Sequence, residues 1–502
     1  MLFDFGMETR RINEIIEMGA KRKLTDKAFL EHEIQKFIAS KERKAMLEGK
    51  AYYAYDQDIK DKKRMVIGEN GKMLEDVQLP NCKLTDNQYA AMVDQKVDYV
   101  LSKPVTFKTE NRKYAKALGT VFNKNFQRLL KNVGKDSYNG GIGWLYPYYD
   151  QEGNFCIRRF APEEILPFWK DDDHTELDCA VRVHYVWAYE GDKEKKIWYV
   201  EVYDTEGIHY FEYKDYHLVP NYTTYYFWRK AEENSDADTN DSSEFYSWNK
   251  VPLIAFKGNS IELPLICKCK CLQDGINEVL SSFGDGMKEN SAGTSILIIK
   301  NYGGTNLGEF RQNLMTYKAV KVETVDGDEG GVDSLKIEVN AENYKTILQE
   351  LKKALIQNCR GYDVEGLKTN GSPNEMTIKA VFSGIDLDAN EIETEYQASF
   401  EQLLWFVNVH FKNTGVGDFM NEEIDVIFNR DLMINESQII TDCQNSTGVI
   451  SHKTIVANHP WVTDPEEEWK QIEEEKNEAL DPGYDFGNTP KEPDEEDEDE
   501  EE

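Results

Sequence analysis

Residues 340–390 are predicted to form a helix, a glycine-rich loop and a second helix, and this hairpin limits what the rest of the chain can build. Asn340 suits a helix N-cap, and Gly361 suits a C-terminal stop. Apolar residues recur between them at helical spacing, namely Tyr344, Ile347, Leu348, Leu351, Ala354 and Leu355. Glycine, asparagine and a Ser-Pro pair in residues 365–374 disfavour regular structure, and a second helical pattern begins at Glu375. This pattern alone predicts an antiparallel helical hairpin with a surface loop.

The composition is that of a globular protein. The chain has 502 residues, of which 40% are hydrophobic and 30% charged, and this length ordinarily divides into roughly two to four domains. The longest apolar runs, 295–299 and 403–411, are far shorter than the ~20 residues that cross a bilayer. The N-terminus lacks the pattern of a signal peptide, so we expect a cytoplasmic protein without a membrane anchor. The eight cysteines are expected to be free thiols.

The formal net charge of −34 excludes a protein that holds DNA tightly over a broad surface. Such proteins cluster Lys and Arg to displace counterions from phosphates, and this chain has the opposite balance. Contact with nucleic acid must therefore be non-adhesive or confined to small basic patches. Residues 464–502 contain 20 acidic and 3 basic side chains. Residues 479–502 are expected to be disordered because their composition offers little apolar surface to bury.

The N-terminal half is predicted to contain helices followed by a sheet. Helical patterns cover residues 24–49, residues 85–101 with Thr85 or Asp86 as the N-cap, and residues 114–133. Short runs rich in Trp, Tyr, Val and Ile then predict an antiparallel sheet. Its expected strands cover residues 144–149, 180–189, 198–203, 208–213 and 251–256.

The C-terminal half is predicted to be mainly helical. A helical pattern at 265–287 precedes a small α/β unit with strands at 295–299, 319–323 and 332–339 and a helix near 307–314. A long helix covers residues 388–411, with a buried stripe formed by Ile392, Tyr396, Phe400, Leu403, Leu404, Val407 and Phe411. Shorter helices are predicted near 436–443, 451–457 and 465–478.

No motif in the sequence specifies a catalytic or metal site. The three cysteines of residues 267–271 cannot share one helix face, and buried thiols explain them better than a metal. Residues 171–174 (Asp-Asp-Asp-His) lack the spaced ligands and glycine of a calcium loop, so a solvated turn is the simpler interpretation. Phosphate-loop, nucleophile-elbow and dinucleotide-binding patterns are missing from the sequence. A structural or assembly role is therefore favoured over an enzyme, and no cofactor is expected.

Four groups of residues, taken in order, carry a family resemblance. The first is Ser40, Arg43, Met46, Gly49, Tyr52, Tyr53, Asp58 and Ile59, and the second is Asn81, Lys83, Leu84, residues 93–96, Tyr99 and residues 103–106. The third is Gly143, Gly153, residues 162–165, Pro167, Arg182 and Tyr185, and the fourth is residues 448–451, Thr454, Pro460, Asp464 and the Glu-rich helix after it. Their order and spacing resemble the portal proteins of tailed double-stranded DNA bacteriophages, specifically the siphophage portal family of phages that infect Gram-positive bacteria.

The resemblance implies an α+β portal fold that assembles as a ring, with a wing, a two-helix stem, a small α/β clip and a helical crown. The wing would comprise residues 1–260, with N-terminal helices and the antiparallel sheet, and the long helix 379–415. Residues 261–290 and 340–362 would be the stem helices, with the clip, residues 291–339, between them. Residues 416–478 would form the crown, followed by the acidic tail, residues 479–502.

The loop of the opening hairpin, residues 363–378, would be the tunnel loop that projects towards DNA. The residues that the resemblance places there are Glu365, Gly366, Leu367, Lys368, Thr369, Asn370, Gly371, Ser372, Pro373 and Asn374. Lys345, Lys352 and Lys353 of the second stem helix are expected to form sparse basic rings in the channel, although ordinary solvated helix charge explains them equally well. The family often has Ser-Gly before a small and apolar run, whereas this chain has Asn374 and Glu375 there.

The implied function is a non-enzymatic channel at one capsid vertex, through which double-stranded DNA is packaged and ejected. A mostly acidic wall suits this role because it avoids the affinity that would stall a sliding duplex. The implied partners are further copies of the chain, usually twelve in a ring, the large subunit of the terminase motor, the major capsid and scaffolding proteins, and a head-completion or connector protein. The protein would reside in the virion, and in the host cytoplasm during assembly. The alternatives are a cytosolic oligomeric assembly protein that does not conduct DNA, and a metal-dependent nucleic-acid enzyme that uses Asp171, Asp172 and Asp173.

Overall fold

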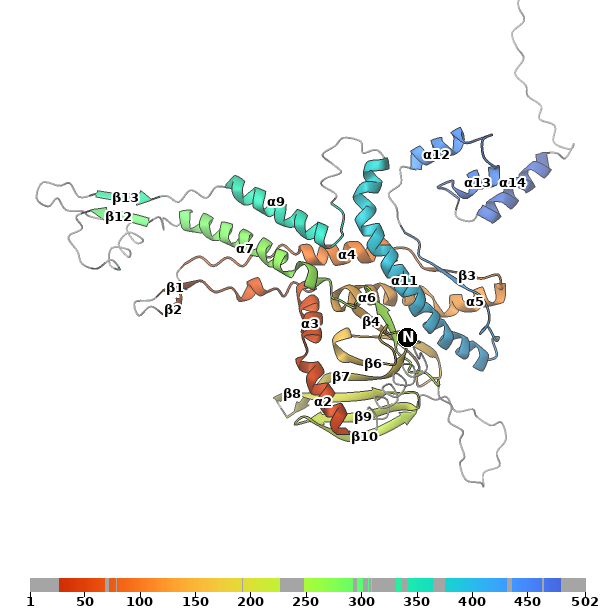
Figure 1. Cartoon of the computed structure of the whole chain (residues 1–502), viewed down its shortest axis with the longest axis horizontal. Helices are drawn as coiled ribbons and strands as arrows, with labels where there is room; N and C mark the ends of the chain where they lie inside the picture. Colours follow the sequence, from red (N-terminus) through yellow and green to blue (C-terminus); the bar gives the residue numbers. More distant parts are fainter. Residues whose placement is uncertain are drawn as a thin grey trace, which may run out of the picture. The chain divides into compact units, whose positions relative to one another are not determined.

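The computed structural model describes two compact units of the chain. The residues described are 27–67, 72–77, 79–191, 193–225, 248–291, 296–300, 306, 308, 331–335, 341–363, 375–430, 436–462 and 465–479. The first unit comprises Met1–Pro373 and Thr377–Asp431, and the second comprises Asn374–Met376 and Leu432–Glu502 (Figure 1). The predicted acidic tail lies outside the described residues, except for Ala479.

Polar cap residues divide the N-terminal part of the first unit into short helices. Ser40 separates α2 (Lys27–Ala39) from α3 (Lys41–Tyr53), and its side chain accepts a hydrogen bond from the Arg43 N–H. Asn123 caps α6 (Lys124–Gly140) after α5 (Arg112–Val121) in the same way. The single helices predicted for residues 24–49 and 114–133 are therefore each two helices, because a break of one or two residues barely disturbs the apolar spacing. Asn87, not Thr85 or Asp86, caps α4 (Gln88–Leu101).

Two antiparallel sheets follow, and every strand predicted between residues 144 and 256 is present. The larger sheet has the strand order β10-β9-β8-β7-β6, and the smaller has the order β11-β4-β5. Their strands are β4 (Ile142–Tyr149), β5 (Phe155–Phe160), β6 (Ile165–Trp169), β7 (Leu177–Glu190), β8 (Lys193–Tyr203), β9 (Gly207–Lys214), β10 (His217–Tyr225) and β11 (Ile254–Lys257). A separate hairpin pairs β1 (Met65–Ile67) with β2 (Met73–Glu75).

The long helix α11 (Glu375–Asn413) organises the main core. The predicted stripe from Ile392 to Phe411 is buried in full, which confirms that prediction. Figure 1 shows α11 passing α6 and β4, and the hydroxyl of Tyr396 donates to Ser137 Oγ of α6 at 2.8 Å. A smaller core forms where α2 covers the larger sheet and Leu30 and Ile34 pack with valines of β7 and β8.

Two further helices, α7 (Ile266–Ser291) and α9 (Ala341–Asn358), lie side by side and carry a strand pair at their far ends (Figure 1). The strands are β12 (Ile296–Lys300) and β13 (Gly331–Leu335), which pair antiparallel. The strand predicted at 319–323 and nearly all of the helix predicted near 307–314 lie outside the described residues. α7 and α9 begin within a few residues of the starts predicted for them.

Residues 416–431 belong with the first unit, although the crown was predicted to begin at residue 416. Within them, β14 (Asp425–Ile427) pairs antiparallel with β3 (Thr106–Lys108). The turn residues around Gly415 end α11, but the compact unit continues beyond them. The sequence does not show that the helix and the unit end at different residues. Similarly, α11 begins at Glu375, inside the segment 363–378 predicted as a loop.

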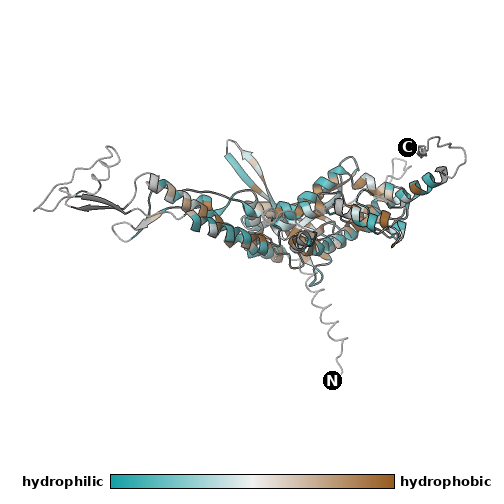
Figure 2. Ribbon diagram, turned by 90° about the horizontal axis from the view of Figure 1, so that it is seen from above, coloured by the Kyte–Doolittle hydropathy of each residue, from teal (hydrophilic) through white to brown (hydrophobic). Residues whose placement is uncertain are grey.

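The described residues of the second unit that follow Asp431 form α12 (Glu436–Asn445), α13 (His452–Ala457) and α14 (Pro465–Ala479), as predicted. Figure 2 shows hydrophilic and hydrophobic residues mixed along the helices of the chain. Among the residues described, no helix combines the length and the apolarity needed to cross a membrane.

Candidate functional site

The helices α7 and α9, predicted as the stem, pack antiparallel. A Cβ on Gly275 of α7 would lie 3.8 Å from Leu351 Cδ1 of α9, so the helices approach closely there. Towards the end of α7 and the start of α9, the rings of Phe283 and Tyr344 have centroids 5.3 Å apart. An early residue of one helix thus meets a late residue of the other. The pair is a helical hairpin that carries β12 and β13.

A stripe of buried polar side chains on α7 holds the segment that precedes α4. The stripe contains every fourth residue, Gln273, Asn277, Ser281 and Asp285, each at most 2% exposed, and we call it the polar ladder. These side chains accept hydrogen bonds from the backbone N–H groups of Tyr89, Asp86, Leu84 and Cys82, in that order, at 2.9, 3.0, 3.0 and 2.5 Å.

The polar ladder works because two repeats nearly coincide. Four helical residues advance about 6.0 Å, and two extended residues advance about 6.6 Å, so Asn277, Ser281 and Asp285 meet alternate N–H groups. The step from Asp86 to Tyr89, which lies in the first turn of α4, is three residues. Burial acts to raise the pKa of Asp285, but hydrogen bonds from Cys82 and the ammonium of Lys62 lower it below its ordinary value. The N–H groups of Cys82, Leu84 and Asp86 are thereby hydrogen-bonded without a partner strand.

The three lysines predicted to line a channel lie differently on α9. Lys345 and Lys353 are exposed. Lys352 instead forms an ion pair, with its Nζ 2.7 Å from Asp86 Oδ2 of the segment held by the polar ladder. Because its charge is shared with a carboxylate, Lys352 is less suited to guiding a phosphate than the other two. The placement of Lys345 and Lys353 in a channel stays a prediction.

The predicted tunnel-loop residues 365–374 lie outside the described residues, but the chain on either side is described. The N–H of Tyr362 donates to Gln95 Oε1 and its carbonyl accepts from Gln95 Nε2, each at 3.0 Å. The Tyr362 ring lies 4.5 Å from that of Phe382 on α11. The base of the predicted loop is therefore fixed to both α4 and α11.

Polar side chains near the start of α11 fix that helix to α4. The side chain of Lys96 is completely buried, and its Nζ donates to Asp388 Oδ2 at 2.6 Å. The hydroxyl of Tyr99 donates to Asp386, two residues before Asp388 on α11. Burial lowers the pKa of Lys96, and the attraction of Asp388 opposes that shift.

Arg430 attaches the end of the first unit to the same part of α11. Its Nε donates to Glu393 Oε1 and its Nη2 donates to Asn390 Oδ1, both at 2.6 Å. The guanidinium of Arg430 is therefore not left without a partner, because a carboxylate and an amide oxygen both accept hydrogen bonds from it. The segment after β14 is thus anchored immediately before the second unit begins.

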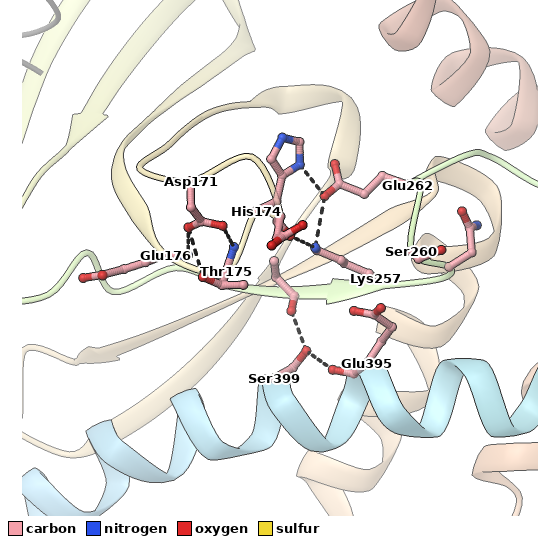
Figure 3. A network of polar contacts seen from close by, with 12 residues as sticks. Asp171, His174, Thr175, Glu176, Lys257, Ser260, Glu262, Glu395 and Ser399 are labelled. Atoms are coloured by element: carbon pink, nitrogen blue, oxygen red, sulfur yellow. Dashed lines mark hydrogen bonds and ion pairs between the residues drawn. The ribbon is translucent and has the colours of Figure 1, made fainter. Parts of the chain in front are cut away.

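The acidic residues 171–174 form a capped turn (Figure 3). The Asp171 carboxylate accepts hydrogen bonds from the N–H groups of Thr175 and Glu176 at 2.8 and 2.9 Å. Burial acts to raise the pKa of Asp171, but these hydrogen bonds hold it below its ordinary value. His174 Nδ1 lies 2.7 Å from Glu262 Oε1 across the adjoining pocket, whose volume is about 540 Å³.

Lys257 supplies the positive charge of this pocket. Its Nζ donates to the Asp173 carbonyl at 2.9 Å and lies 3.5 Å from Glu262 Oε1. Within the part of the chain that the structure describes, no group of three or more His, Cys, Asp or Glu side chains is placed to hold a metal ion. The turn predicted for residues 171–174 is confirmed, and the described residues lend the metal-enzyme alternative no support.

The cysteines of residues 267–271 only partly follow the prediction. Cys269 is buried, but Cys267 and Cys271 are exposed, so the expectation of buried thiols was wrong for the outer two. The i, i+2, i+4 spacing turns the middle residue towards the core and the others away from it.

Sequence reasoning missed the polar ladder and the anchors of α11. A signal for the ladder exists, because Gln273, Asn277, Ser281 and Asp285 recur at intervals of four within one predicted helix. No comparable signal joins Lys96 to Asp388, since the two residues are separated by 292 positions.

Comparison with known proteins identifies the family. A family model described as phage portal protein, SPP1 Gp6-like, matches residues 34–481. The portal protein of Bacillus phage SPP1 is 28% identical over 472 residues, which are 93% of this chain and 90% of that protein. The portal protein of Clostridium phage phiCD119 is 27% identical over 462 residues, 89% of this chain and 96% of that protein.

A solved chain from the neck of an empty GTA particle is also similar, at 11% identity and a TM-score of 0.40, over 74% of this chain and 89% of that one. The match to the family model covers most of the chain and is not confined to one site. It spans every described helix and strand from the middle of α2 to α14. The resemblance and the mixed α and β fold predicted from the sequence are confirmed, and the chain belongs to the SPP1 Gp6-like family of phage portal proteins.

Proposed function

We propose that copies of this chain form a ring at one capsid vertex and that the ring conducts double-stranded DNA during packaging and ejection. Two observations support the proposal: the family match over residues 34–481, and the α7–α9 hairpin that carries β12 and β13 away from the core. In this proposal the chain forms the channel for DNA and catalyses no reaction. The packaging force comes from a separate ATP-hydrolysing motor.

Each part of the hairpin receives a role. α7 and α9 form the stem, and residues 291–339, which include β12 and β13, form the clip on which the large subunit of the terminase motor docks. Residues 363–374 form the tunnel loop at the narrowest part of the channel, with their base fixed by Tyr362. Lys345 and Lys353, together with Lys368, guide phosphates transiently within a mostly acidic wall.

The remaining contacts concern assembly. The ring consists of about twelve copies and meets the major capsid and scaffolding proteins while the head forms in the host cytoplasm. A head-completion or connector protein joins it afterwards, and the finished protein resides at the portal vertex of the virion. Residues 432–479 form the crown, since residues 416–431 pack with the first unit.

A cysteine cross-link to DNA tests the conduit. The exposed Cys267 and Cys271 are first replaced by serine, and Thr369→Cys is then compared with Glu152→Cys in the exposed β4–β5 turn. Heads packaged with DNA that carries a thiol-reactive backbone are expected to give an adduct with Thr369→Cys and none with Glu152→Cys. Packaging without any adduct at position 369 would overturn the placement of the loop.

The alternative, an assembly protein that does not conduct DNA, gives a different result. Electron microscopy and light scattering would then show rings of purified chain, and heads built with those rings would form but stay empty when the motor and ATP are supplied. Filled heads contradict that alternative directly.

A further inference from the structure

A strongly basic stretch covers β3, α5 and the first half of α6. Residues 103–131 contain eight basic side chains and a single acidic one, Glu110, in a chain whose net charge is −34. Five of the basic residues lie on the two helices and are exposed: Arg112, Lys113, Lys116, Lys124 and Arg128. We call these five the basic face.

The side chains of the basic face have no carboxylate partner within the described residues. Lys131, one turn further along α6, does have one, because its Nζ lies 2.5 Å from Asp98 Oδ1. Lys108 of β3 lies opposite Asp425 in the β3–β14 register. Glu422 accepts a hydrogen bond from Asn111 Nδ2 at the start of α5. Among the described residues, Asp98, Asp425 and Glu422 form no ion pair with the basic face.

The placement of these cations is unfavourable for folding alone. Arg112, Lys113 and Lys124 occupy the first turns of α5 and α6, where neither helix has an acidic residue. The helix macrodipole is positive at that end and repels cations. Lys124 and Arg128 are also separated by one helical turn, so like charges stand side by side. An anionic partner relieves both repulsions.

The chemistry of the surface favours a polyanion over a protein. Protein interfaces usually have an apolar, often aromatic, centre. Among the large hydrophobic side chains that the described structure leaves exposed, none falls within residues 103–131. Exposed Lys and Arg side chains without an apolar centre suit contact with a phosphate backbone.

We propose that the basic face binds the phosphate backbone of double-stranded DNA outside the channel, on the side of the ring that meets the packaged genome. The inference rests on the proposed function, in which the motor docks on the clip. Figure 1 shows α5 and β3 at the opposite end of the first unit from β12 and β13. This end faces the capsid interior when β12 and β13 face the motor.

A covalently closed circular duplex separates this surface from the channel, because a closed circle cannot thread through a ring. Immobilised full-length rings are expected to retain the circle at low salt and to release it as salt rises. Lys124→Gln combined with Arg128→Gln should lower the slope of log affinity against log salt by about 2 for each engaged subunit. Lys41→Gln combined with Lys44→Gln changes the charge equally at two exposed lysines of α3 and should leave the slope unchanged.

The outcomes distinguish the two proposals. If rings package linear DNA but never retain the circle, or if the Lys124 and Arg128 variant retains it as well as the wild type, the basic face is not a DNA site. If that variant fails to form rings by light scattering, the face is a contact between copies and the inference falls. Failure of wild-type rings to fill heads with linear DNA would instead contradict the conduit itself.

Discussion

Lys96 of α4 and Asp388 of α11 form an ion pair in which the ammonium is completely buried, with Nζ 2.6 Å from Oδ2. The hydroxyl of Tyr138 donates to the same carboxylate oxygen at 3.0 Å, and Lys96 Nζ lies 5.5 Å from the centroid of the Tyr138 ring. Removing two charges from water is unfavourable, and the loss is offset only while both partners are present. The pair therefore locks α11 to α4.

Removal of one partner is expected to be strongly destabilising. Asp388→Ala should lower the free energy of unfolding by about 3–5 kcal/mol, because the ammonium of Lys96 is left buried and unpaired. Urea unfolding followed by circular dichroism measures the change. Leu387→Ala, at a neighbouring side chain that is 64% exposed, is the matched control and should change the free energy by less than about 0.5 kcal/mol.

The combination Lys96→Met with Asp388→Asn should be milder than Asp388→Ala alone. It removes both charges, and the new amide oxygen still accepts from the Tyr138 hydroxyl. If the combination is as damaging as Asp388→Ala, packing and not the buried charge determines the stability of this contact.

The polar ladder predicts a local loss of protection as well as a global loss of stability. Asn277 Oδ1 accepts from the Asp86 N–H at 3.0 Å, and its Nδ2 donates to Gln57 Oε1 at 2.5 Å. Asn277→Leu removes the partner of the Asp86 N–H and of Gln57 Oε1. The loss of these two hydrogen bonds should lower the free energy of unfolding by about 2–4 kcal/mol. Hydrogen exchange should accelerate first at the amides of Leu84 and Asp86.

The neighbouring exposed residue Glu278 provides the control, since Glu278→Gln leaves the polar ladder intact. Unchanged exchange at Leu84 and Asp86 in Asn277→Leu would show that something other than the ladder holds residues 82–86.

The sequence predicted those parts of the fold that depend on local periodicity. The strands between residues 144 and 256 and the buried stripe of α11 were found because side chains of one element repeat at its own period. Breaks made by single cap residues, such as Ser40, escaped detection because apolar spacing continues across them. The first compact unit extends to Asp431, beyond the boundary predicted at residue 416, because the pairing of β14 with β3 joins residues more than 300 positions apart.

The candidate site was less predictable for the same physical reason. Lys352 was identified as a stem cation, but its ion pair with Asp86 depends on how α9 lies against the segment before α4. The charge of a residue is written in the sequence, whereas its partner is set by packing. Lys345 and Lys353 are exposed as solvated cations must be, and that property alone does not distinguish a channel wall from an ordinary helix surface.

Two glycines with similar backbone conformations are expected to respond differently to alanine. Gly141 has φ of +79° and Gly153 has φ of +83°, so both substitutions place a side chain in the left-handed region, at about 1–2 kcal/mol. A Cβ on Gly141 would also lie 2.0 Å from the backbone oxygen of Glu262, whereas a Cβ on Gly153 would meet nothing within 4 Å. Thermal unfolding should therefore show Gly141→Ala at least about 2 kcal/mol less stable than Gly153→Ala. Equal melting temperatures would contradict the close approach of the α6–β4 junction to the backbone of Glu262.

The pair His209 and Asp204 should make stability depend on pH near neutrality. His209 Nε2 lies 2.9 Å from Asp204 Oδ2, and this hydrogen bond raises the pKa of His209 while burial opposes the shift. A raised pKa means that the folded state keeps the proton on His209 up to a higher pH than the unfolded state does. The contribution of His209 is thus complete below the ordinary histidine pKa of about 6.5 and is lost as pH rises through the higher folded value.

Asp204 sets the acid limit of the same contribution. Burial acts to raise the pKa of Asp204, but hydrogen bonds from His209 and from the N–H groups of Gly207 and Glu206 lower it. Its stabilising effect is present above the ordinary Asp pKa of about 3.9 and is lost as pH falls through the lower folded value. The pair therefore contributes most between about pH 4 and 6.5.

A difference measurement isolates this effect from the other titrating groups. The free energy of unfolding of the wild type minus that of His209→Gln should be largest near pH 5–6 and should shrink by up to about 1 kcal/mol between pH 6.5 and 9, because the neutral imidazole no longer attracts the carboxylate. His452→Gln, at an exposed histidine of α13, is the matched control for the substitution itself. A wild-type minus His209→Gln difference that stays constant from pH 5 to 9 would mean that His209 binds its proton equally in the folded and unfolded chains, so that its hydrogen bond with Asp204 does not favour the imidazolium.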